Sequence, residues 1–378
     1  MKKLAPAVAA LALLPASASA QTPVTGAINE PAPRPATPER IATLQVAAGF
    51  KLSVAAQNLG NARMLAVGRD GTVFVTRREE GDVLALRDRD GDGAYERRRT
   101  ATRGLKLVHG ITLRGNRVYL VTDTKLYRAR VDGDRFTQRR LLTADLPDAG
   151  QHPNRTLAFG PDQQLYITVG STCNACDDSN PQSATILRAR ADGTHRRVFA
   201  SGLRNTIGFG WHPQTEQLWG MDHGSDWRGD DQPPEELNRI VRGGNYGWPF
   251  CFGARAVDRY LPADPPSGTP ESYCARTAPP TLTYQAHSAP IGMAFTGDGN
   301  AFIAMRGSWN RGAPVGYKLV RLNFSGGQPT GFEDIVSGFL TEGGQAQFGR
   351  LAGVTVDRDG SVLFSDDSNG VLYRLSRS

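Results

Sequence analysis

The hydrophobic and polar residues of this chain repeat one pattern six times: a short apolar strand, a tight polar turn and a second apolar strand. The six copies are residues 64–75, 110–121, 157–168, 207–219, 292–303 and 353–364. Asp-Gly and Gly-Asn occupy several of the turns, and these residues tolerate the positive φ angles of tight hairpins. Each copy therefore predicts a β-hairpin.

The spacing of the copies predicts how the hairpins assemble. Strands this short cannot bury a hydrophobic face alone, so neighbouring copies are expected to stack. The first four copies begin about 45 to 50 residues apart, which is the spacing of four-stranded propeller blades. The next interval is longer, and its additional residues fall in the loop-rich region 230–287. We predict an all-β, six-bladed β-propeller with a loop-rich insertion after the fourth hairpin, and a β-sandwich is the alternative.

The start of the chain lacks the repeat. Residues 1–20 combine Lys2 and Lys3 with an apolar run and an Ala-Ser-Ala cleavage pattern, which predicts a secretory signal peptide rather than a membrane anchor. Residues 21–40 are rich in Pro, Ala and Thr and predict an exposed or loosely docked arm.

The remaining residues, 41–378, show no composition break that would separate two cores, so we expect one propeller domain. Helix content should be small. The best helical candidate is 41–48, with residues 37–40 as a plausible helix start.

Charge and hydropathy limit the partners that we expect. The formal net charge is +7, and loss of Lys2 and Lys3 with the signal peptide leaves +5. The excess comes from scattered arginines and not from a basic stripe with aromatic platforms, so no nucleic-acid partner is expected. No later segment reaches the roughly 18 continuous apolar residues of a membrane span. The oligomeric state cannot be inferred from the sequence.

Four cysteines in an exported chain suggest disulfide bonds. They are Cys173, Cys176, Cys251 and Cys274. Of the three possible pairings we favour Cys173–Cys176 with Cys251–Cys274, because these bonds close short loops. The Cys-Asn-Ala-Cys spacing also suits a redox pair or half of a metal site, whereas Asp177 stands where c-type haem attachment requires a histidine.

Residues that could catalyse a reaction or bind a ligand are concentrated in 201–249 and in the loops just ahead of the repeats. The stretch 201–249 combines an Arg-Asn pair, an Asp-His-Gly-Ser-Asp sequence and an acidic run. The loops carry His109, His152, Arg204 with Asn205, Pro290 and Arg350. Propellers bind ligands at one end of the central channel, on such loops. We therefore expect these residues to converge on one central site.

Four motifs extend this expectation. They are His152 ahead of residues 155–162, Gly202-Leu203-Arg204-Asn205, Asp222-His223-Gly224 followed by 243–249, and Phe348-Gly349-Arg350. In this order and spacing the chain resembles the soluble glucose/sorbosone dehydrogenase family. Those proteins are six-bladed propellers that use pyrroloquinoline quinone (PQQ). The Cys-Asn-Ala-Cys and Asp-His-Gly-Ser-Asp sequences look closer to the sorbosone-dehydrogenase-like branch.

The resemblance implies a role for each matching residue. His152 matches the general base that takes the proton of the substrate hydroxyl, a task that suits histidine. Arg204 matches an arginine over the quinone carbonyls, and Asn205 matches a cofactor-binding amide. Arg306 and Arg350 match cations that pair with the cofactor carboxylates.

The resemblance also implies calcium. The backbone carbonyls of Gly224 and Ser225 match ligands of the cofactor-bound Ca²⁺, and Glu236 with Tyr246 matches a second, structural calcium site. His109 lies near the position of a family amide and is a further candidate for cofactor binding.

Two positions depart from the family pattern. Gln151 replaces the Asp that often orients the base, and Ala352 replaces a second arginine near Arg350.

Other polar residues have less specific interpretations. His223 is interpreted as structural, and His195, His212 and His287 as surface or turn residues. The sequence 88–93 resembles the first half of a calcium loop, but Arg99 stands where the bidentate Glu is expected, so a weak calcium site and a simple hairpin turn both remain open.

The sequence thus predicts a periplasmic or secreted quinoprotein that oxidises a sugar, sugar aldehyde or polyol and passes electrons to a periplasmic acceptor. A calcium-dependent propeller hydrolase of the lactonase type and a non-catalytic carbohydrate- or protein-binding propeller are the alternatives. The acidic residues cluster in one loop, which disfavours the hydrolase.

Overall fold

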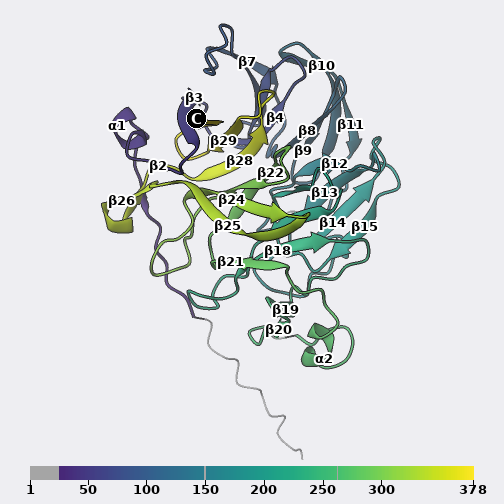
Figure 1. Ribbon diagram of the computed structural model, residues 1–378. Coiled ribbons are helices and arrows are strands. Elements are labelled where there is room, and N and C mark those ends of the chain that lie inside the picture. Colours follow the sequence, from purple (N-terminus) through teal and green to yellow (C-terminus); the bar gives the residue numbers. More distant parts are fainter. Residues whose placement is uncertain (1–24, 149, 262) are drawn as a thin grey trace, which may run out of the picture.

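The computed structural model describes residues 25–148, 150–261 and 263–378, and these form an all-β fold with very little helix (Figure 1). The signal peptide expected at 1–20 lies outside the described residues. Within the described ranges, six sheets contain four or five antiparallel strands each, and two small sheets contain three and two strands. Among the described residues, no helix has the length and apolar character needed to cross a membrane.

Each predicted repeat forms the first two strands of one sheet, so all six expected hairpins are confirmed. The hairpins are β4 (Ala62–Val67) with β5 (Val73–Arg77), β8 (Gly110–Arg114) with β9 (Arg117–Val121), β12 (Leu157–Phe159) with β13 (Leu165–Val169), β16 (Phe209–Trp211) with β17 (Leu218–Asp222), β22 (Pro290–Phe295) with β23 (Ala301–Met305), and β28 (Leu351–Val356) with β29 (Val362–Asp366).

Two further strands complete each sheet. They are β6 (Asp82–Arg87) and β7 (Arg97–Thr102), β10 (Leu126–Asp132) and β11 (Arg135–Thr143), β14 (Thr185–Ala189) and β15 (Arg197–Ser201), β18 (Glu235–Ile240) and β21 (Leu282–Tyr284), β24 (Lys318–Ser325) and β25 (Gln328–Ser337), and β30 (Val371–Arg377) and β3 (Phe50–Ala56). The last pair joins the two ends of the chain, because β3 from the N-terminal part pairs with β30 at the C-terminus (Figure 1).

The hydrophobic core lies between consecutive sheets. Phe74 and Val118, for example, belong to one buried cluster that joins the sheet of β4–β7 to that of β8–β11. Equivalent clusters join every other consecutive pair, and the cluster of Val75 and Leu363 joins the last sheet to the first. This arrangement is consistent with a β-propeller and not with the two face-to-face layers of a sandwich.

Glycines let the inner strands of neighbouring sheets approach closely. A Cβ on Gly353 of β28 would lie 2.2 Å from the carbonyl oxygen of Arg63 in β4, and one on Gly292 of β22 would lie 2.4 Å from that of Ala352. Neither backbone oxygen can move away without a large energetic cost, so only glycine, which has no side chain, fits at these positions. The centre of the fold is therefore packed backbone against backbone.

The helix expected at 41–48 is wrong in position. The helix α1 (Pro38–Ile41) begins at the expected start, with Pro38 at its first turn and the Thr37 side chain accepting a hydrogen bond from the backbone N–H of Arg40 (3.4 Å). It ends after one turn because Gln45 and Val46 form β2 (Gln45–Val46), which pairs with β25. Pairing with an open sheet edge outweighed local helix propensity.

The N-terminal arm is docked along the molecule in its described part. Its strand β1 (Ala32–Pro33) pairs with β27 (Ala346–Gln347), which also pairs with β26 (Leu340–Thr341) ahead of the short 3₁₀ helix η1 (Glu342–Gly344). Ahead of β1, the Asn29 backbone N–H donates to the Trp309 carbonyl (2.9 Å), and just after β1, Arg34 pairs with Glu342 (2.7 Å).

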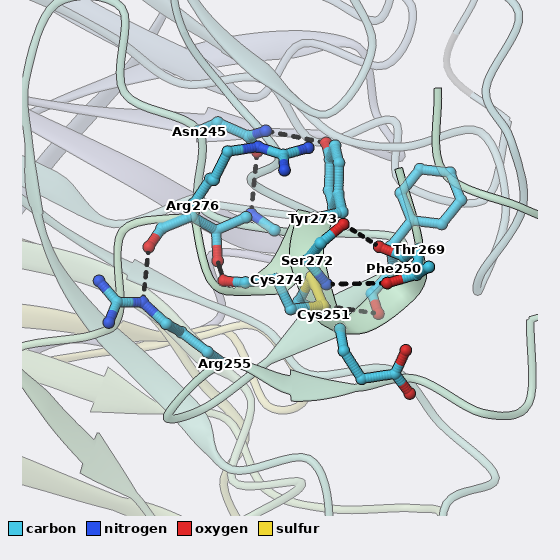
Figure 2. The surroundings of a disulfide bond; sticks show 12 residues. Asn245, Phe250, Cys251, Arg255, Thr269, Ser272, Tyr273, Cys274 and Arg276 are labelled. Atoms are coloured by element: carbon cyan, nitrogen blue, oxygen red, sulfur yellow. Dashed lines mark hydrogen bonds between the residues drawn. A yellow bond between two sulfur atoms is a disulfide. The ribbon is translucent and has the colours of Figure 1, made fainter. Parts of the chain in front are cut away.

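The loop-rich segment 241–281 leaves the fourth sheet between β18 and β21. It contains β19 (Cys251–Phe252), β20 (Ala256–Val257) and α2 (Pro270–Cys274). Cys251 is bonded to Cys274, and a hydrogen bond from the Asn245 amide to the Tyr273 hydroxyl (2.8 Å) ties the helix back to the chain (Figure 2). Cys173 is bonded to Cys176, so both favoured pairings are confirmed.

We expect Gly353→Ala to destabilise the fold by about 1 to 3 kcal/mol, because the added methyl group overpacks the contact with the Arg63 backbone. Gly297→Ala is the matched control, since a Cβ there meets nothing within 4 Å. Urea unfolding of both variants measures the difference. Equal stabilities for the two variants would contradict the close packing of β28 on β4.

Candidate functional site

The hairpin topology places many loop residues at one end of the sheets. In an antiparallel hairpin, the start of the first strand and the end of the second lie at the same end. Residues ahead of β12, β16 and β28 therefore meet residues that follow β17, β23 and β29. A cavity of about 550 Å³ lies at this end.

Six of the predicted site residues line this one cavity. They are His152, Arg204, Asn205, Gly224, Arg306 and Arg350. They come from four different sheets, as the expected convergence of loops requires. The predicted residues His109, Ser225, Glu236 and Tyr246 do not line it.

His152 lies on the loop ahead of β12. Its Nδ1 is 2.9 Å from both the carbonyl oxygen and the hydroxyl of Ser171. The Ser171 hydroxyl donates its proton to the Cys173 carbonyl (2.7 Å), so both Ser171 oxygens act as acceptors toward the ring. Nδ1 therefore carries the proton. Nε2 has no hydrogen bond to another described residue and keeps its lone pair.

The surroundings keep this imidazole neutral. Burial, together with the positive charge of Arg204, lowers the pKa of His152 to about 3. The departure at Gln151 also has a structural consequence. The ring is oriented by Ser171, which follows the neighbouring strand β13, rather than by the side chain that precedes His152.

Arg204 is fixed along one edge of its guanidinium group. Nε donates to the Asn174 carbonyl and Nη2 donates to Asn174 Oδ1, both at 2.8 Å. Nη2 also pairs with Asp226 (3.2 Å). Nη1 has no hydrogen bond to another described residue, and the side chain lines the cavity. Asn205 follows at the cavity wall, with its backbone N–H donating to Asp222 (2.9 Å).

A buried carboxylate organises the opposite wall. Asp367, which follows β29, pairs with both Arg63 and Arg306. Burial alone raises the pKa of Asp367, but the two guanidinium groups outweigh it and hold that pKa below its ordinary value. Arg63 comes from β4 and Arg306 from the end of β23, so one carboxylate joins three sheets at the cavity.

The cationic wall suits a ligand that carries carboxylates. Arg350 donates from Nη2 to the Gly307 carbonyl (3.1 Å), while its buried Nε has no hydrogen-bond partner among the described residues. The buried Nε of Arg63 also has none in the described chain. Buried donors without partners are uncommon and favour an anionic ligand at this wall. The residues present thus fit the carboxylate groups of PQQ.

The acidic loop after β17 offers backbone oxygens. Gly224 lines the cavity and donates its N–H to Glu235 Oε2 (3.1 Å), while Ser225 is buried beside it. Within the described ranges, no hydrogen bond uses the carbonyl oxygen of Gly224 or of Ser225. Such oxygens are ligands that Ca²⁺ prefers. The predicted cation position therefore fits the local geometry.

Glu236 and Tyr246 lie at a separate small cavity of about 20 Å³, which Ser225 also lines. The Glu236 carboxylate accepts a hydrogen bond from the Gly253 backbone N–H (2.6 Å), and burial raises the pKa of Glu236 to about 7. The space is large enough for a single water molecule or ion. A second calcium ion there remains a prediction.

The remaining histidines lie in different parts of the fold. His109 is fully buried behind the cavity, with Nε2 3.0 Å from Arg63 Nη2 and Nδ1 3.0 Å from the Arg155 carbonyl. His223, interpreted as structural, and His287, interpreted as a surface or turn residue, both line the cavity, and His287 stands in a turn. His212 is a buried turn residue, held among aromatic rings.

The loop 88–96 joins β6 to β7, away from the cavity residues. Carboxylate oxygens of Asp88, Asp90, Asp92 and Glu96 lie within 4.8 Å of one another. Asp88 also accepts hydrogen bonds from the backbone N–H groups of Gly91 (2.7 Å) and Gly93 (3.0 Å), as in an ordinary turn. Both interpretations of this loop remain open.

Sequence reasoning missed several residues of the site. Arg63, Asp367, Asn174 and His287 all line the cavity. Arg63 directly precedes its repeat, just as His109 does, and this shared position was a usable signal. Asp367 and Asn174 follow second strands of sheets, and only the assembled fold brings them to the cavity.

The comparisons with known proteins agree with this geometry. A family model described as TrAA12-like matches residues 44–378. The chain belongs to the TrAA12-like family. A PQQ-dependent sugar dehydrogenase of Hypocrea jecorina is 27% identical over 282 residues, which cover 65% of this chain and 63% of the relative. The chain thus spans less than two thirds of that relative's length.

Two solved structures have the same fold. A Trichoderma reesei protein of carbohydrate-active enzyme family AA12 has a TM-score of 0.79 at 23% identity, covering 89% of this chain and 98% of its own. The holo PQQ domain of pyranose dehydrogenase from Coprinopsis cinerea has a TM-score of 0.77 at 22% identity, covering 92% and 98%. The resemblance to PQQ-dependent sugar dehydrogenases is confirmed at the level of the family.

The low pKa of His152 makes acid sensitivity a test of the site. The folded-state pKa of about 3 lies below the unfolded value of about 6.5, so the unfolded chain binds more protons between these pH values. The stabilisation of the folded state that this pKa difference provides is complete above pH 6.5 and is lost as the pH falls toward 3. We expect the stability of the wild type to drop by about 2 kcal/mol relative to His152→Gln between pH 6.5 and 4.5 in urea unfolding. Parallel pH profiles would show that the folded imidazole titrates normally.

Proposed function

We propose that the protein is a PQQ-dependent dehydrogenase that oxidises a sugar, a sorbosone-like sugar aldehyde or a polyol with the assistance of Ca²⁺. One observation carries the proposal. The neutral imidazole of His152 and the guanidinium of Arg204 line the same cavity, and His152 Nε2 and Arg204 Nη1 have no hydrogen bond to any described residue. The names of the Hypocrea and Coprinopsis relatives support the same activity.

The residues divide the chemical work between them. PQQ, when bound, supplies the quinone that accepts hydride, and Ca²⁺ polarises it. His152 takes the hydroxyl proton of the substrate at Nε2. Arg204 donates from Nη1 to oxygen on which negative charge develops. A base with a pKa near 3 is weak, and carboxylates brought into the cavity shift that pKa toward the working pH.

Other residues hold the cofactor. Arg306 and Arg350 pair with its carboxylates, and Asn205 donates an amide hydrogen bond. Arg63 adds a cation to the same wall, and this cation compensates for the family arginine that is replaced by Ala352. His109 acts through Arg63, since the two side chains are hydrogen-bonded.

The metal ligands are backbone carbonyls of Gly224 and Ser225 for the catalytic Ca²⁺. Glu236 and Tyr246 bind a second, structural Ca²⁺ at the small cavity. Both positions require oxygen ligands, and the free carbonyls of the acidic loop support the first.

The remaining parts of the proposal concern the whole protein. The chain is a six-bladed propeller over residues 41–378, with a loop-rich insertion after the fourth hairpin and a docked arm ahead of it. Residues 1–20 direct export and are removed, so the mature protein works in the periplasm. It passes electrons from the sugar to a periplasmic acceptor.

The geometry does not favour the lactonase-type hydrolase. That mechanism needs several carboxylates converging on one metal. Here Asp226 pairs with Arg204, and Asp367 pairs with Arg63 and Arg306. The carboxylate of Glu235, which also lines the cavity, accepts hydrogen bonds from the backbone N–H groups of Gly224 and Ala289. A non-catalytic binding protein needs no general base, and the free Nε2 of His152 then has no use.

Reconstitution tests the function. The apo-protein is loaded with PQQ and Ca²⁺ and screened with aldoses and sugar aldehydes, using reduction of an artificial dye as the readout. We expect activity that requires both additions and that falls at least about a hundredfold in His152→Ala, the usual cost of losing a general base. The exposed His195 offers the control, and His195→Ala should keep full activity.

Two outcomes would contradict the proposal. Dye reduction that is independent of PQQ would exclude a quinoprotein. Full activity in the loaded His152→Ala variant would show that another group is the base.

A further inference from the structure

The two proposed catalytic side chains are held by one short loop, residues 171–176. The loop follows β13 and is closed by the Cys173–Cys176 disulfide. Its first residue, Ser171, binds Nδ1 of His152, and its central residue, Asn174, binds Arg204. In each case the loop binds one side of the imidazole or guanidinium group. The nitrogen on the other side has no hydrogen bond to a described residue, and both side chains line the cavity.

Asn174 has an unusually complete set of contacts for a loop side chain. Its Oδ1 accepts from Arg204 Nη2 (2.8 Å) and from the Asp226 backbone N–H (2.7 Å), while its Nδ2 donates to the Asp226 carbonyl (3.1 Å). Its own carbonyl accepts from Arg204 Nε (2.8 Å). Guanidinium and backbone N–H groups only donate, so the amide has one orientation that satisfies every partner.

This set of contacts determines which guanidinium nitrogen of Arg204 stays available to a ligand. Nε and Nη2 of Arg204 are both engaged by Asn174, whereas Nη1 bonds no residue in the described part of the chain. The side chain carries rotamer freedom worth about 2 kcal/mol in the absence of such anchors. A second anchor on the backbone fixes the strand end itself, because the Ser171 N–H donates to the Arg204 carbonyl (2.8 Å).

The disulfide controls the backbone from which these contacts come. The Cys173 carbonyl accepts the proton of the Ser171 hydroxyl, and this hydrogen bond makes both Ser171 oxygens acceptors toward His152. In the sequence, Asn174 stands between the two bonded cysteines, so the disulfide closes the short loop that carries its carbonyl and side chain. A short loop without the cross-link samples more backbone conformations and holds these carbonyls less firmly.

We infer that the Cys173–Cys176 loop is the positioning element of the active site, with Asn174 as a positioning residue for Arg204. The inference rests on the proposed function. It makes turnover depend on the disulfide although neither sulfur touches the reacting atoms. Optimal placement of catalytic groups is worth large factors in rate, and a displacement of about 1 Å can cost a hundredfold.

The test compares four variants of the full mature chain, each loaded with PQQ and Ca²⁺ and assayed with the aldose that the wild type oxidises fastest. The variants are Asn174→Ala, Cys173→Ser/Cys176→Ser, Cys251→Ser/Cys274→Ser and Asn180→Ala. The second disulfide is the control for the loss of a cross-link. The exposed Asn180, just beyond the loop, is the control for the loss of an amide. Chemical reductants are avoided because they also reduce the quinone.

We expect kcat to fall about tenfold to a hundredfold in Asn174→Ala and in Cys173→Ser/Cys176→Ser, with a much smaller change in KM. Asn180→Ala should keep the wild-type kcat. Cys251→Ser/Cys274→Ser should lower kcat less than Cys173→Ser/Cys176→Ser does, although Cys251 lines the small cavity of Glu236. Partial unfolding also lowers the apparent kcat at an unchanged KM, so each kcat is divided by the folded fraction, measured by circular dichroism, before the variants are compared. Asn174→Ala keeps the test decisive if the cysteine variant does not fold.

A readout without turnover separates this inference from the proposed function. Hydrogen exchange of the Arg204 Nε–H and the ¹⁵N shifts of the His152 ring are measured by NMR. We expect a protected Nε–H and an Nδ1–H tautomer in the wild type, and at least about tenfold faster Nε–H exchange in Cys173→Ser/Cys176→Ser.

These signals in a protein that oxidises no sugar would overturn the proposed function and support the loop's role. Folded Asn174→Ala and Cys173→Ser/Cys176→Ser variants with wild-type kcat and unchanged exchange would overturn the loop's role.

Discussion

The buried carboxylate of Asp367 is the interaction on which the cavity depends. It pairs with Arg63 and Arg306, which come from two other sheets. Removing this shared carboxylate would leave the buried guanidinium of Arg63 without its counter-charge, which costs about 3 to 5 kcal/mol. The carboxylate thus holds two guanidinium groups, from two other sheets, at fixed positions. The charged wall of the site therefore rests on this contact, which also links the last sheet to the first.

Around that wall, the molecule separates orientation from chemistry. His152 and Arg204 each give one edge to a neighbouring backbone and present the other to the cavity. Glycines between the inner strands bring the sheets close enough for these loops to meet. The groups that act on the substrate are thus held in place by hydrogen bonds to neighbouring residues.

The predictability of each feature follows from how local its cause is. The hairpins were predicted because alternating apolar residues and Asp-Gly turns act within a dozen residues. The helix near residue 41 was misplaced because pairing of Gln45 and Val46 with β25, far along the chain, decided that segment. His152, Arg204 and Arg350 were found from family motifs. Asp367 and Asn174 were missed because their partners lie on distant strands and no local pattern announces them.

The central claim is that one cavity holds a planar, carboxylate-bearing quinone beneath His152 and Arg204. A crystal structure of the protein soaked with PQQ and Ca²⁺ tests it most directly. The account predicts PQQ in the 550 Å³ cavity, with its carboxylates at Arg306 and Arg350 and Ca²⁺ on the carbonyls of Gly224 and Ser225. An empty cavity at saturating PQQ, or PQQ bound on another face of the molecule, would contradict it.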